Sequence, residues 1–312
     1  MQERIMVYGG TGSGKSTGWL TLARQQPENT FYCVDTDKSS LRLLNTEFKD
    51  VLEKGNVKVL HCRTWESCKQ TLESLIPTIK EKDWLIIDKI DPLWSFLQNW
   101  YTLKVFNKNI DEYFLQLRKS VGGGSKLESF KGWTDWAVIN STYQSLIDPV
   151  MYDYDYNIYI TAKSKDYDPK GELEDAELKE SFSVVGYQPE GEKRNADRCH
   201  TILFLNHDSF GYYMTTVKDR GRQQVKEYAF TNFAETYQKI IDNIQITEAA
   251  TPKSGARAEA KADAEKISFS KWLDKNHVLH SDAVKILEIE SLDAITDYKS
   301  AQNKIKEAKG IL

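Results

Sequence analysis

The chain has 312 residues, with 42 Lys and Arg against 46 Asp and Glu, so its formal charge is −4. Its content of 40% hydrophobic and 12% aromatic residues excludes a disordered chain, which needs low hydrophobicity and high net charge. The sequence contains no run of about 18 apolar residues, so no membrane span is expected. Its four cysteines are too few for a disulfide scaffold. We therefore expect a protein of a reducing cytoplasm without a membrane partner. The mild acidity implies that any nucleic-acid contact uses local patches or loops.

Short apolar segments alternate with amphipathic ones over the first two thirds of the chain. Residues 65–80 form a predicted helix with Leu72, Leu75 and Ile76 on one face. The predicted strands are residues 4–8, 30–34, 57–61, 84–87 and 156–161. Such alternation is typical of an α/β fold with a mainly parallel sheet that helices cover on both faces.

The first predicted strand leads into a glycine-rich segment that matches the P-loop pattern G-x-x-x-x-G-K-[ST]. Glycines let the backbone wrap closely around a polyphosphate, with N–H groups directed at its oxygens, and the following helix adds its positive end. In this pattern Lys15 reaches the β- and γ-phosphates of ATP, and the Ser16 hydroxyl binds Mg²⁺. The expected nucleotide-binding residues here are Gly9, Gly10, Thr11, Gly12, Ser13, Gly14, Lys15, Ser16 and Thr17.

Two further predicted strands end in carboxylates. The second strand is followed by Asp35 and Asp37, and the strand 84–87 by Asp88. Because ligands bind at the carboxyl edge of a parallel sheet, Asp88 is the expected Walker B carboxylate of the Mg²⁺ shell. The alternative is an ordinary aspartate at a strand end. The next residue is Lys89, where many AAA-type ATPases carry a catalytic glutamate, so we expect the catalytic base elsewhere.

The later part of the chain predicts a hairpin, a helix and a separate module. Strands are expected at 201–205 and 212–217 with a turn between them, followed by a helix over 232–244. Residues 249–267 have almost no large apolar side chains, which predicts a linker. A small helical module is expected over 268–312, after an ATPase domain over 1–248.

In order and content, these motifs resemble the bacteriophage RecA-like nucleotide-binding family of recombination and single-strand annealing ATPases. The resemblance covers about residues 1–245. It rests on GGTGSGKST, LIIDKIDPLW, WTDWAVINSTYQSLIDPV followed by YNIYITAKSK, and TTVKDRGR. It implies a RecA-like core in which the strand 156–161 lies between the P-loop and Walker B strands.

The resemblance also implies roles for several side chains. RecA-type enzymes carry a catalytic glutamate in an Asp-x-Glu turn after the second strand, and Asp37 falls at that position. Thr161 or Lys163 would face the γ-phosphate as a sensor, unless Lys163 is a loop lysine in water. Lys218 and Arg220 would reach ATP on a neighbouring subunit, and the alternative is a solvated turn.

Two loops are candidates for contact with single-stranded DNA. RecA-type recombinases hold the strand in loops after the Walker B and sensor strands, which here correspond to residues 119–131 and 164–198. The first contains three glycines among Lys119, Lys126 and Lys131, which suits a phosphate backbone. The second contains an acidic stretch that phosphates repel, beside the basic Lys193 and Arg194. Both could equally be flexible surface loops.

Together these features predict a Mg²⁺-dependent ATPase acting in phage recombination or single-strand annealing, in the cytoplasm of an infected bacterium. The expected form is a homo-oligomer on single-stranded DNA, with a phage single-strand DNA-binding protein as a further partner. The first alternative is a nucleotide-gated assembly module with little turnover, favoured if Asp37, Lys218 and Arg220 do not converge on phosphate. The second is a small-molecule kinase, which needs a lid with arginines; only Arg194 and Arg198 offer one.

Overall fold

The computed structural model describes most of the first 220 residues and parts of the remainder. The described residues are 2–120, 132–169, 175–209, 211–220, 228–230, 269, 272, 273, 276, 278–289, 291, 295 and 297–309. Contacts divide the chain into two units, Met1–Ala250 and Thr251–Leu312. The predicted linker over 249–267, the predicted helix over 232–244 and most of the loop 119–131 lie outside the described residues.

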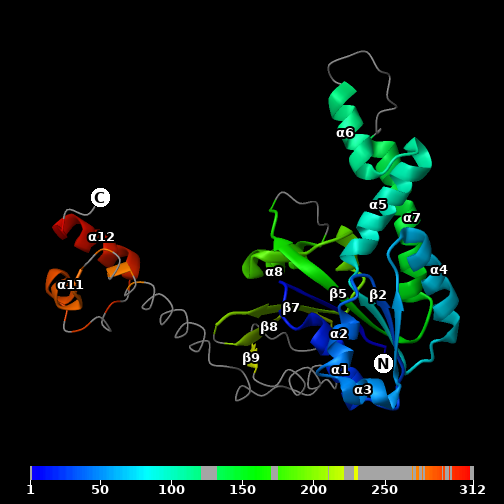
Figure 1. The fold of residues 1–312 in the computed structure, drawn as a ribbon, viewed down its shortest axis with the longest axis horizontal. Helices are drawn as coiled ribbons and strands as arrows, with labels where there is room; N and C mark the ends of the chain where they lie inside the picture. The colour runs from blue at the N-terminus through cyan, green and yellow to red at the C-terminus, as the bar shows by residue number, and fades with distance from the viewer. Residues whose placement is uncertain are drawn as a thin grey trace. The chain divides into compact units, whose positions relative to one another are not determined.

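Among the described residues, the first unit has a nine-stranded sheet in the order β3-β2-β4-β5-β1-β7-β8-β9, with β6 paired to β5 (Figure 1). The pairs from β3 to β7 are parallel, whereas β8, β9 and β6 pair antiparallel. The strands are β1 (Arg4–Gly9), β2 (Phe31–Asp35), β3 (Val57–His61), β4 (Trp84–Asp88), β5 (Asn157–Asp166), β6 (Tyr187–Pro189), β7 (Thr201–His207), β8 (Tyr212–Asp219) and β9 (Tyr228–Phe230). The predicted α/β fold with a mainly parallel central sheet is confirmed, and β5 lies between β1 and β4 as expected.

Helices cover both faces of the sheet, and each face has its own core. In β1, Ile5 and Val7 belong to the cluster that contains Trp19 of α1 (Lys15–Gln25), and Met6 and Tyr8 belong to the other. The first face also carries α2 (Ser40–Asn45) and α3 (Lys49–Lys54), and the second carries α4 (Trp65–Leu75), α5 (Asp91–Phe106), α7 (Gly132–Tyr152) and α8 (Ala176–Val185). Burial on both faces explains why the central strands read as continuous apolar runs.

The helix predicted over 65–80 is shorter than expected. Thr64 starts it with a capping box, in which its hydroxyl accepts from the Ser67 N–H and the Ser67 hydroxyl accepts from the Thr64 N–H. The helix ends at Leu75, and a 3₁₀ turn, Ile76–Thr78, follows with Pro77 in it. Proline lacks the N–H that a longer helix would need, and its ring crowds the preceding turn.

The region 164–198 is not a loop throughout, which corrects the expectation. The strand β5 continues to Asp166, where Ser164–Asp166 pairs with β6. The Asp175 side chain accepts from the Glu177 and Leu178 N–H groups to start α8. Leu178 and Phe182 of that helix are buried in the core, so apolar side chains hold the region in place.

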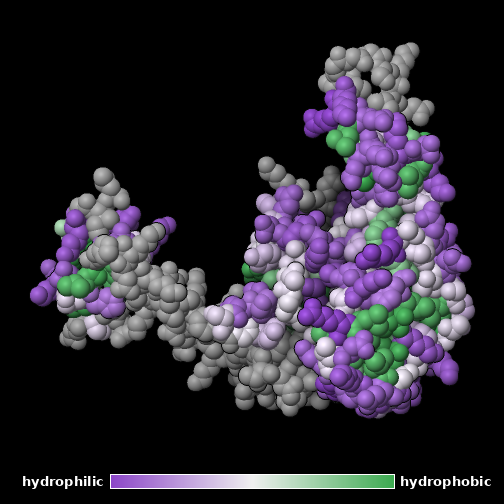
Figure 2. Space-filling model, viewed as in Figure 1, coloured by the Kyte–Doolittle hydropathy of each residue, from purple (hydrophilic) through white to green (hydrophobic). Residues whose placement is uncertain are grey.

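A helical arm of α5, α6 (Ile110–Ser120) and α7 extends beyond the sheet in Figure 1. Hydrophobic side chains also reach the surface near β3, as Figure 2 shows; Leu41, Leu52 and Leu60 are 37–44% exposed.

The second unit has its own small core around Phe269, Leu273 and Ile305, with helices α11 (His280–Leu287) and α12 (Tyr298–Lys309). None of the described helices combines the length and apolar character needed to cross a membrane.

Candidate functional site

The P-loop joins β1 to α1 at the carboxyl edge of the sheet, and three of its glycines, Gly9, Gly12 and Gly14, are required by their surroundings or their backbone conformation. A Cβ on Gly9 would lie 2.1 Å from the Leu205 carbonyl oxygen of β7. Gly12 and Gly14 have φ values of 79° and 93°, which side chains rarely adopt. The conformation of the loop therefore depends on glycine, and backbone N–H groups at the start of α1 are available to an anion.

The exposed His207 imidazole, which the sequence analysis did not single out, lies beside Gly12.

Lys15 is folded back onto the loop. Its Nζ donates to the carbonyl oxygens of Gly9 at 2.8 Å and Gly10 at 2.6 Å, and its side chain is buried. Burial and then the charge of Lys89 lower the pKa of Lys15 to about 8. A polyphosphate would replace these neutral acceptors with anionic ones, which favour the charged form of Lys15.

Asp88 ends β4 and is fully buried next to the P-loop. Its Oδ1 accepts from the Thr161 hydroxyl at 2.6 Å, and its Oδ2 accepts from the Trp19 indole at 3.1 Å. Burial raises the pKa of Asp88 despite these donors and despite Ser16, which lies close enough to lower it. The predicted pair of Ser16 and Asp88 is thus brought together by α1 and β4.

The donor set at this edge suits Mg²⁺. A hydroxyl and a carboxylate are hard oxygen donors, and Mg²⁺ commonly takes one or two such groups and completes its shell with waters and phosphate oxygens. Among the described residues, no cluster of three or more His, Cys, Asp or Glu could hold a metal by itself. Ser16 and Asp88 therefore fit a metal bound together with nucleotide.

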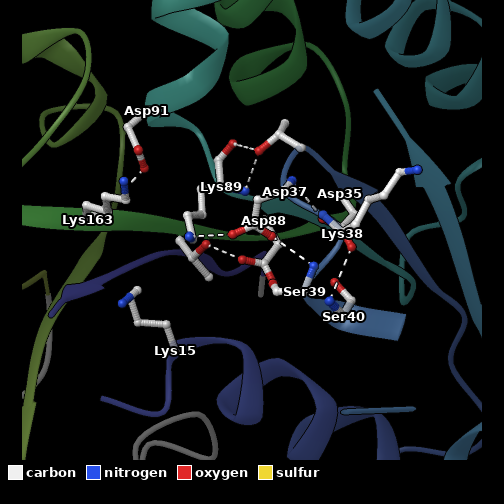
Figure 3. Close-up of polar contacts among 12 residues, drawn as sticks. Lys15, Asp35, Asp37, Lys38, Ser39, Ser40, Asp88, Lys89, Asp91 and Lys163 are labelled. Carbon is white, nitrogen blue, oxygen red and sulfur yellow. Dashed lines mark hydrogen bonds and ion pairs between the residues drawn. The ribbon is translucent and has the colours of Figure 1, made fainter. Parts of the chain in front are cut away.

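The two aspartates after β2 have different surroundings. Asp35 is fully buried, and its carboxylate accepts from the N–H groups of Asp37, Lys38 and Ser40 at 2.7–3.2 Å. Asp35 thereby shapes the turn. The Asp37 side chain remains 27% exposed at the same edge as Lys15 and Asp88 (Figure 3). Of the two, Asp37 is the carboxylate that a water molecule can reach.

Lys89 is the residue at this site whose role sequence reasoning missed. Its Nζ forms an ion pair with Oδ2 of Asp37, across the gap between the neighbouring strands β2 and β4. Burial alone would raise the pKa of Asp37, but hydrogen bonds from Lys89 and Ser39 outweigh it and hold that pKa below its usual value. The only signal in the sequence was a lysine where many AAA-type ATPases carry a catalytic glutamate.

The two sensor candidates on β5 are placed differently. Thr161 is fully buried and donates its hydroxyl to Asp88, so it contacts the Walker B carboxylate. Lys163 is exposed, and its backbone N–H donates to Oδ1 of Asp91 at 3.1 Å (Figure 3). Burial raises the pKa of Asp91. A sensor role for either β5 residue stays a prediction.

Lys218 and Arg220 do not join this site within the chain. Because β8 runs antiparallel to β7, Lys218 pairs with Ile202, which lies beside Met6 of β1; the P-loop end of β1 pairs with Leu205. Both basic residues therefore lie at the opposite edge of the sheet. Lys218 is buried and donates to the Asp197 carbonyl at 3.3 Å, whereas Arg220 is exposed.

The arginines that a kinase lid would need are not both available. The Arg198 side chain is 4% exposed and pairs with Glu192 and Asp148, each at 2.8 Å. The Arg194 side chain is 45% exposed and lies 3.6 Å from Glu192. With one arginine held in buried ion pairs, this region offers little to a small-molecule kinase.

The family model described as an AAA domain matches residues 1–231. The solved structure titled "Crystal structure of the RadB recombinase" is similar to the chain at 13% sequence identity and a TM-score of 0.45. The match covers 72% of this chain and 85% of that chain. No curated protein matches the sequence.

Proposed function

The chain belongs to the AAA domain family, whose model matches residues 1–231, and from that premise we propose that it is a Mg²⁺-dependent ATP hydrolase. One observation carries the proposal. Lys15 of the P-loop, Asp88 and the partly exposed Asp37 meet at one edge of the sheet (Figure 3), and Ser16 lies near Asp88. Each has the chemistry that phosphoryl transfer to water requires.

In the proposed reaction, Asp37 orients a water molecule and accepts its proton. The water oxygen forms a bond to the γ-phosphorus, the bond from that phosphorus to the β–γ bridging oxygen breaks, and ADP leaves with the electron pair. Lys15 stabilises the negative charge on the β- and γ-phosphates. Mg²⁺, when bound by Ser16 and Asp88, would supply further positive charge at the phosphate oxygens.

We propose further that hydrolysis serves DNA recombination or single-strand annealing in a phage, with the protein acting as an oligomer on single-stranded DNA. This part rests on the resemblance of the motif order to recombination ATPases. The predicted DNA contact over 119–131 lies mostly outside the described residues. In the oligomer, Arg220 and Lys218 would serve a neighbouring subunit, and a phage single-strand DNA-binding protein is the expected further partner.

A nucleotide-gated assembly module is the second candidate function, and a specific observation favours it. Asp37 is engaged by Lys89, and Lys218 and Arg220 lie at the far edge of the sheet. A protein arranged in this way could bind ATP and change its partners while turning over slowly.

The deciding experiment measures ATPase rate with and without single-stranded DNA over a range of protein concentrations. The wild type should hydrolyse ATP, and DNA should stimulate it. Lys15→Ala should abolish hydrolysis and weaken nucleotide binding, because the cation nearest the phosphates is removed. Wild-type turnover in this variant would contradict the site. Tight ATP binding with negligible turnover, and without any response to DNA, would favour the assembly module.

A further inference from the structure

The backbone of Lys89 is held in place from the neighbouring strand. Its N–H donates to the Thr36 hydroxyl at 2.9 Å, and the same hydroxyl donates to its carbonyl oxygen at 3.0 Å. This pair of hydrogen bonds ties the turn after β2 to the end of β4. The position of Lys89 is therefore set by two strands, and only its flexible side chain is free to change partners.

Both oxygens of the Asp37 carboxylate already have donors. Oδ1 accepts from the Ser39 N–H at 3.0 Å, and Oδ2 is paired with Nζ of Lys89 (Figure 3). A carboxylate held by an ammonium group is a weak base toward water. Release from Lys89 would leave Oδ2 open to the attacking water.

Lys89 is also close to the phosphate site. Lys89 directly follows Asp88, which accepts a hydrogen bond from Trp19 of α1, the helix that begins at Lys15. After burial, the charge of Lys89 is the second cause of the lowered pKa of Lys15, so the two ammonium groups repel each other. A terminal phosphate between them would turn this repulsion into attraction, because each cation would gain an anionic partner. The side chain of Lys89 is 20% exposed, which leaves it access to the phosphate side.

We propose that Lys89 recognises the γ-phosphate and thereby controls Asp37. Without a γ-phosphate, Lys89 pairs with Asp37. When a nucleoside triphosphate binds, the Lys89 ammonium moves to a γ-phosphate oxygen, and the Asp37 carboxylate becomes free to accept a hydrogen bond from water. With ADP the ion pair remains. This inference rests on the proposed nucleotide site and adds a residue that selects triphosphate over diphosphate.

The test compares binding of ATPγS and of ADP, each with Mg²⁺, by isothermal titration calorimetry. Lys89→Met keeps the length of the side chain and removes its charge. It should weaken ATPγS binding by about tenfold or more, the effect of losing a charge-assisted hydrogen bond. It should leave ADP binding unchanged. Lys89→Arg should restore most of the preference for ATPγS, since the positive charge is kept.

Two further variants separate this role from a structural one. Asp37→Asn should bind ATPγS at least as tightly as the wild type. In this variant Lys89 does not have to break an ion pair with Asp37 before it contacts the γ-phosphate. Lys82→Met is the matched control, since Lys82 is an exposed lysine before the other end of β4, and it should change neither affinity. Circular dichroism with a thermal melt establishes that each variant is folded.

The outcomes distinguish this inference from the proposed function. Equal weakening of ATPγS and ADP in folded Lys89→Met, or no change in either, would refute the role of Lys89 while nucleotide binding stands. Weaker ATPγS binding in Asp37→Asn would also refute the exchange of partners. A folded wild type that binds neither nucleotide would overturn the nucleotide site itself, and the role of Lys89 with it.

Discussion

At the scale of single residues, the two aspartates after β2 show how burial assigns roles to identical side chains. Asp35 is fully buried and accepts three backbone N–H groups, whereas Asp37 keeps solvent access and faces Lys89. The first maintains the turn, and the second remains partly open to solvent. Sequence alone places both at the end of the strand, and only their hydrogen bonds separate them.

Asp37→Asn tests the assignment of the base. The amide cannot accept the proton of water, so turnover should fall by roughly 10²–10⁴-fold, the usual contribution of a general base. ATP binding should persist, because Lys15 and the P-loop are intact. Single-turnover hydrolysis and ATPγS titration measure the two effects separately. Turnover within about threefold of wild type, far short of that range, would place the base elsewhere.

His200 should make stability depend on pH. Its Nε2 lies 2.5 Å from Nη2 of Arg4, which can only donate, so the neutral imidazole accepts this hydrogen bond. Burial, then the charges of Arg4, Arg220 and Lys218, lower its pKa. His200 therefore binds a proton more readily in the unfolded chain than in the folded one. The contribution of neutral His200 to the stability of the fold is complete above about pH 6.5. It is lost as the pH falls toward the lower pKa of the folded state.

Urea unfolding at pH 7.5 and 5.5 measures this effect, with His200→Gln as the comparison. Glutamine can accept from Arg4 but does not titrate, so the midpoint of the variant should change less between the two pH values. Equal changes in both proteins would show that other groups cause the loss.

At the scale of elements, the P-loop depends on one close approach between strands. A Cβ on Gly9 would meet the carbonyl of Leu205, and a strand backbone in the middle of the sheet cannot easily move. Gly9→Ala should therefore cost about 1–3 kcal/mol or more, as overpacking does. Gly10→Ala is the control, because nothing lies within 4 Å of its Cβ position. Calorimetric melting compares the two, and equal midpoints would contradict the close approach.

Sequence patterns predicted the elements better than they predicted the relations between them. The P-loop, the Walker B strand and the pairing of Ser16 with Asp88 follow from local motifs whose spacing determines their geometry. The ion pair of Lys89 with Asp37 requires β2 and β4 to be neighbours, which no local pattern states. A hairpin reverses the chain. The predicted hairpin of β7 and β8 therefore already indicated that Lys218 lies at the edge of the sheet opposite the P-loop.

The region 164–198 shows a second limit. The resemblance to RecA-type recombinases implied a loop here, yet buried Leu178 and Phe182 hold a helix against the core. Only Leu178 and Phe182 of this helix are buried. Two such positions form too weak a periodic signal to predict a helix, and tertiary contacts decide the outcome.

At the scale of the whole molecule, activity should depend on contact between copies if Arg220 acts on a neighbour. Lys15→Ala has a defective site but keeps Arg220, and Arg220→Ala has the reverse defect. Alone, Lys15→Ala should be inactive and Arg220→Ala should hydrolyse ATP slowly, and their mixture should exceed the sum of the two rates. Steady-state assays at several protein concentrations measure this gain, and Lys15→Ala mixed with itself is the control. A mixture that only adds the two rates would exclude the shared site.

The antiparallel course of β8 constrains the symmetry of any such assembly. If the far edge of one copy serves the P-loop edge of the next, the two contacting surfaces are different, and the interface is heterologous. A pair related by a two-fold axis would have to make both contacts at once, from opposite ends of the same body. Copies would instead associate head to tail. Such a series either closes into a ring or stays open, with an unpaired Arg220 edge at one end and an unpaired P-loop edge at the other. In an open series, the subunit at one end would lack Arg220 from a neighbour and would be the slowest to hydrolyse its ATP.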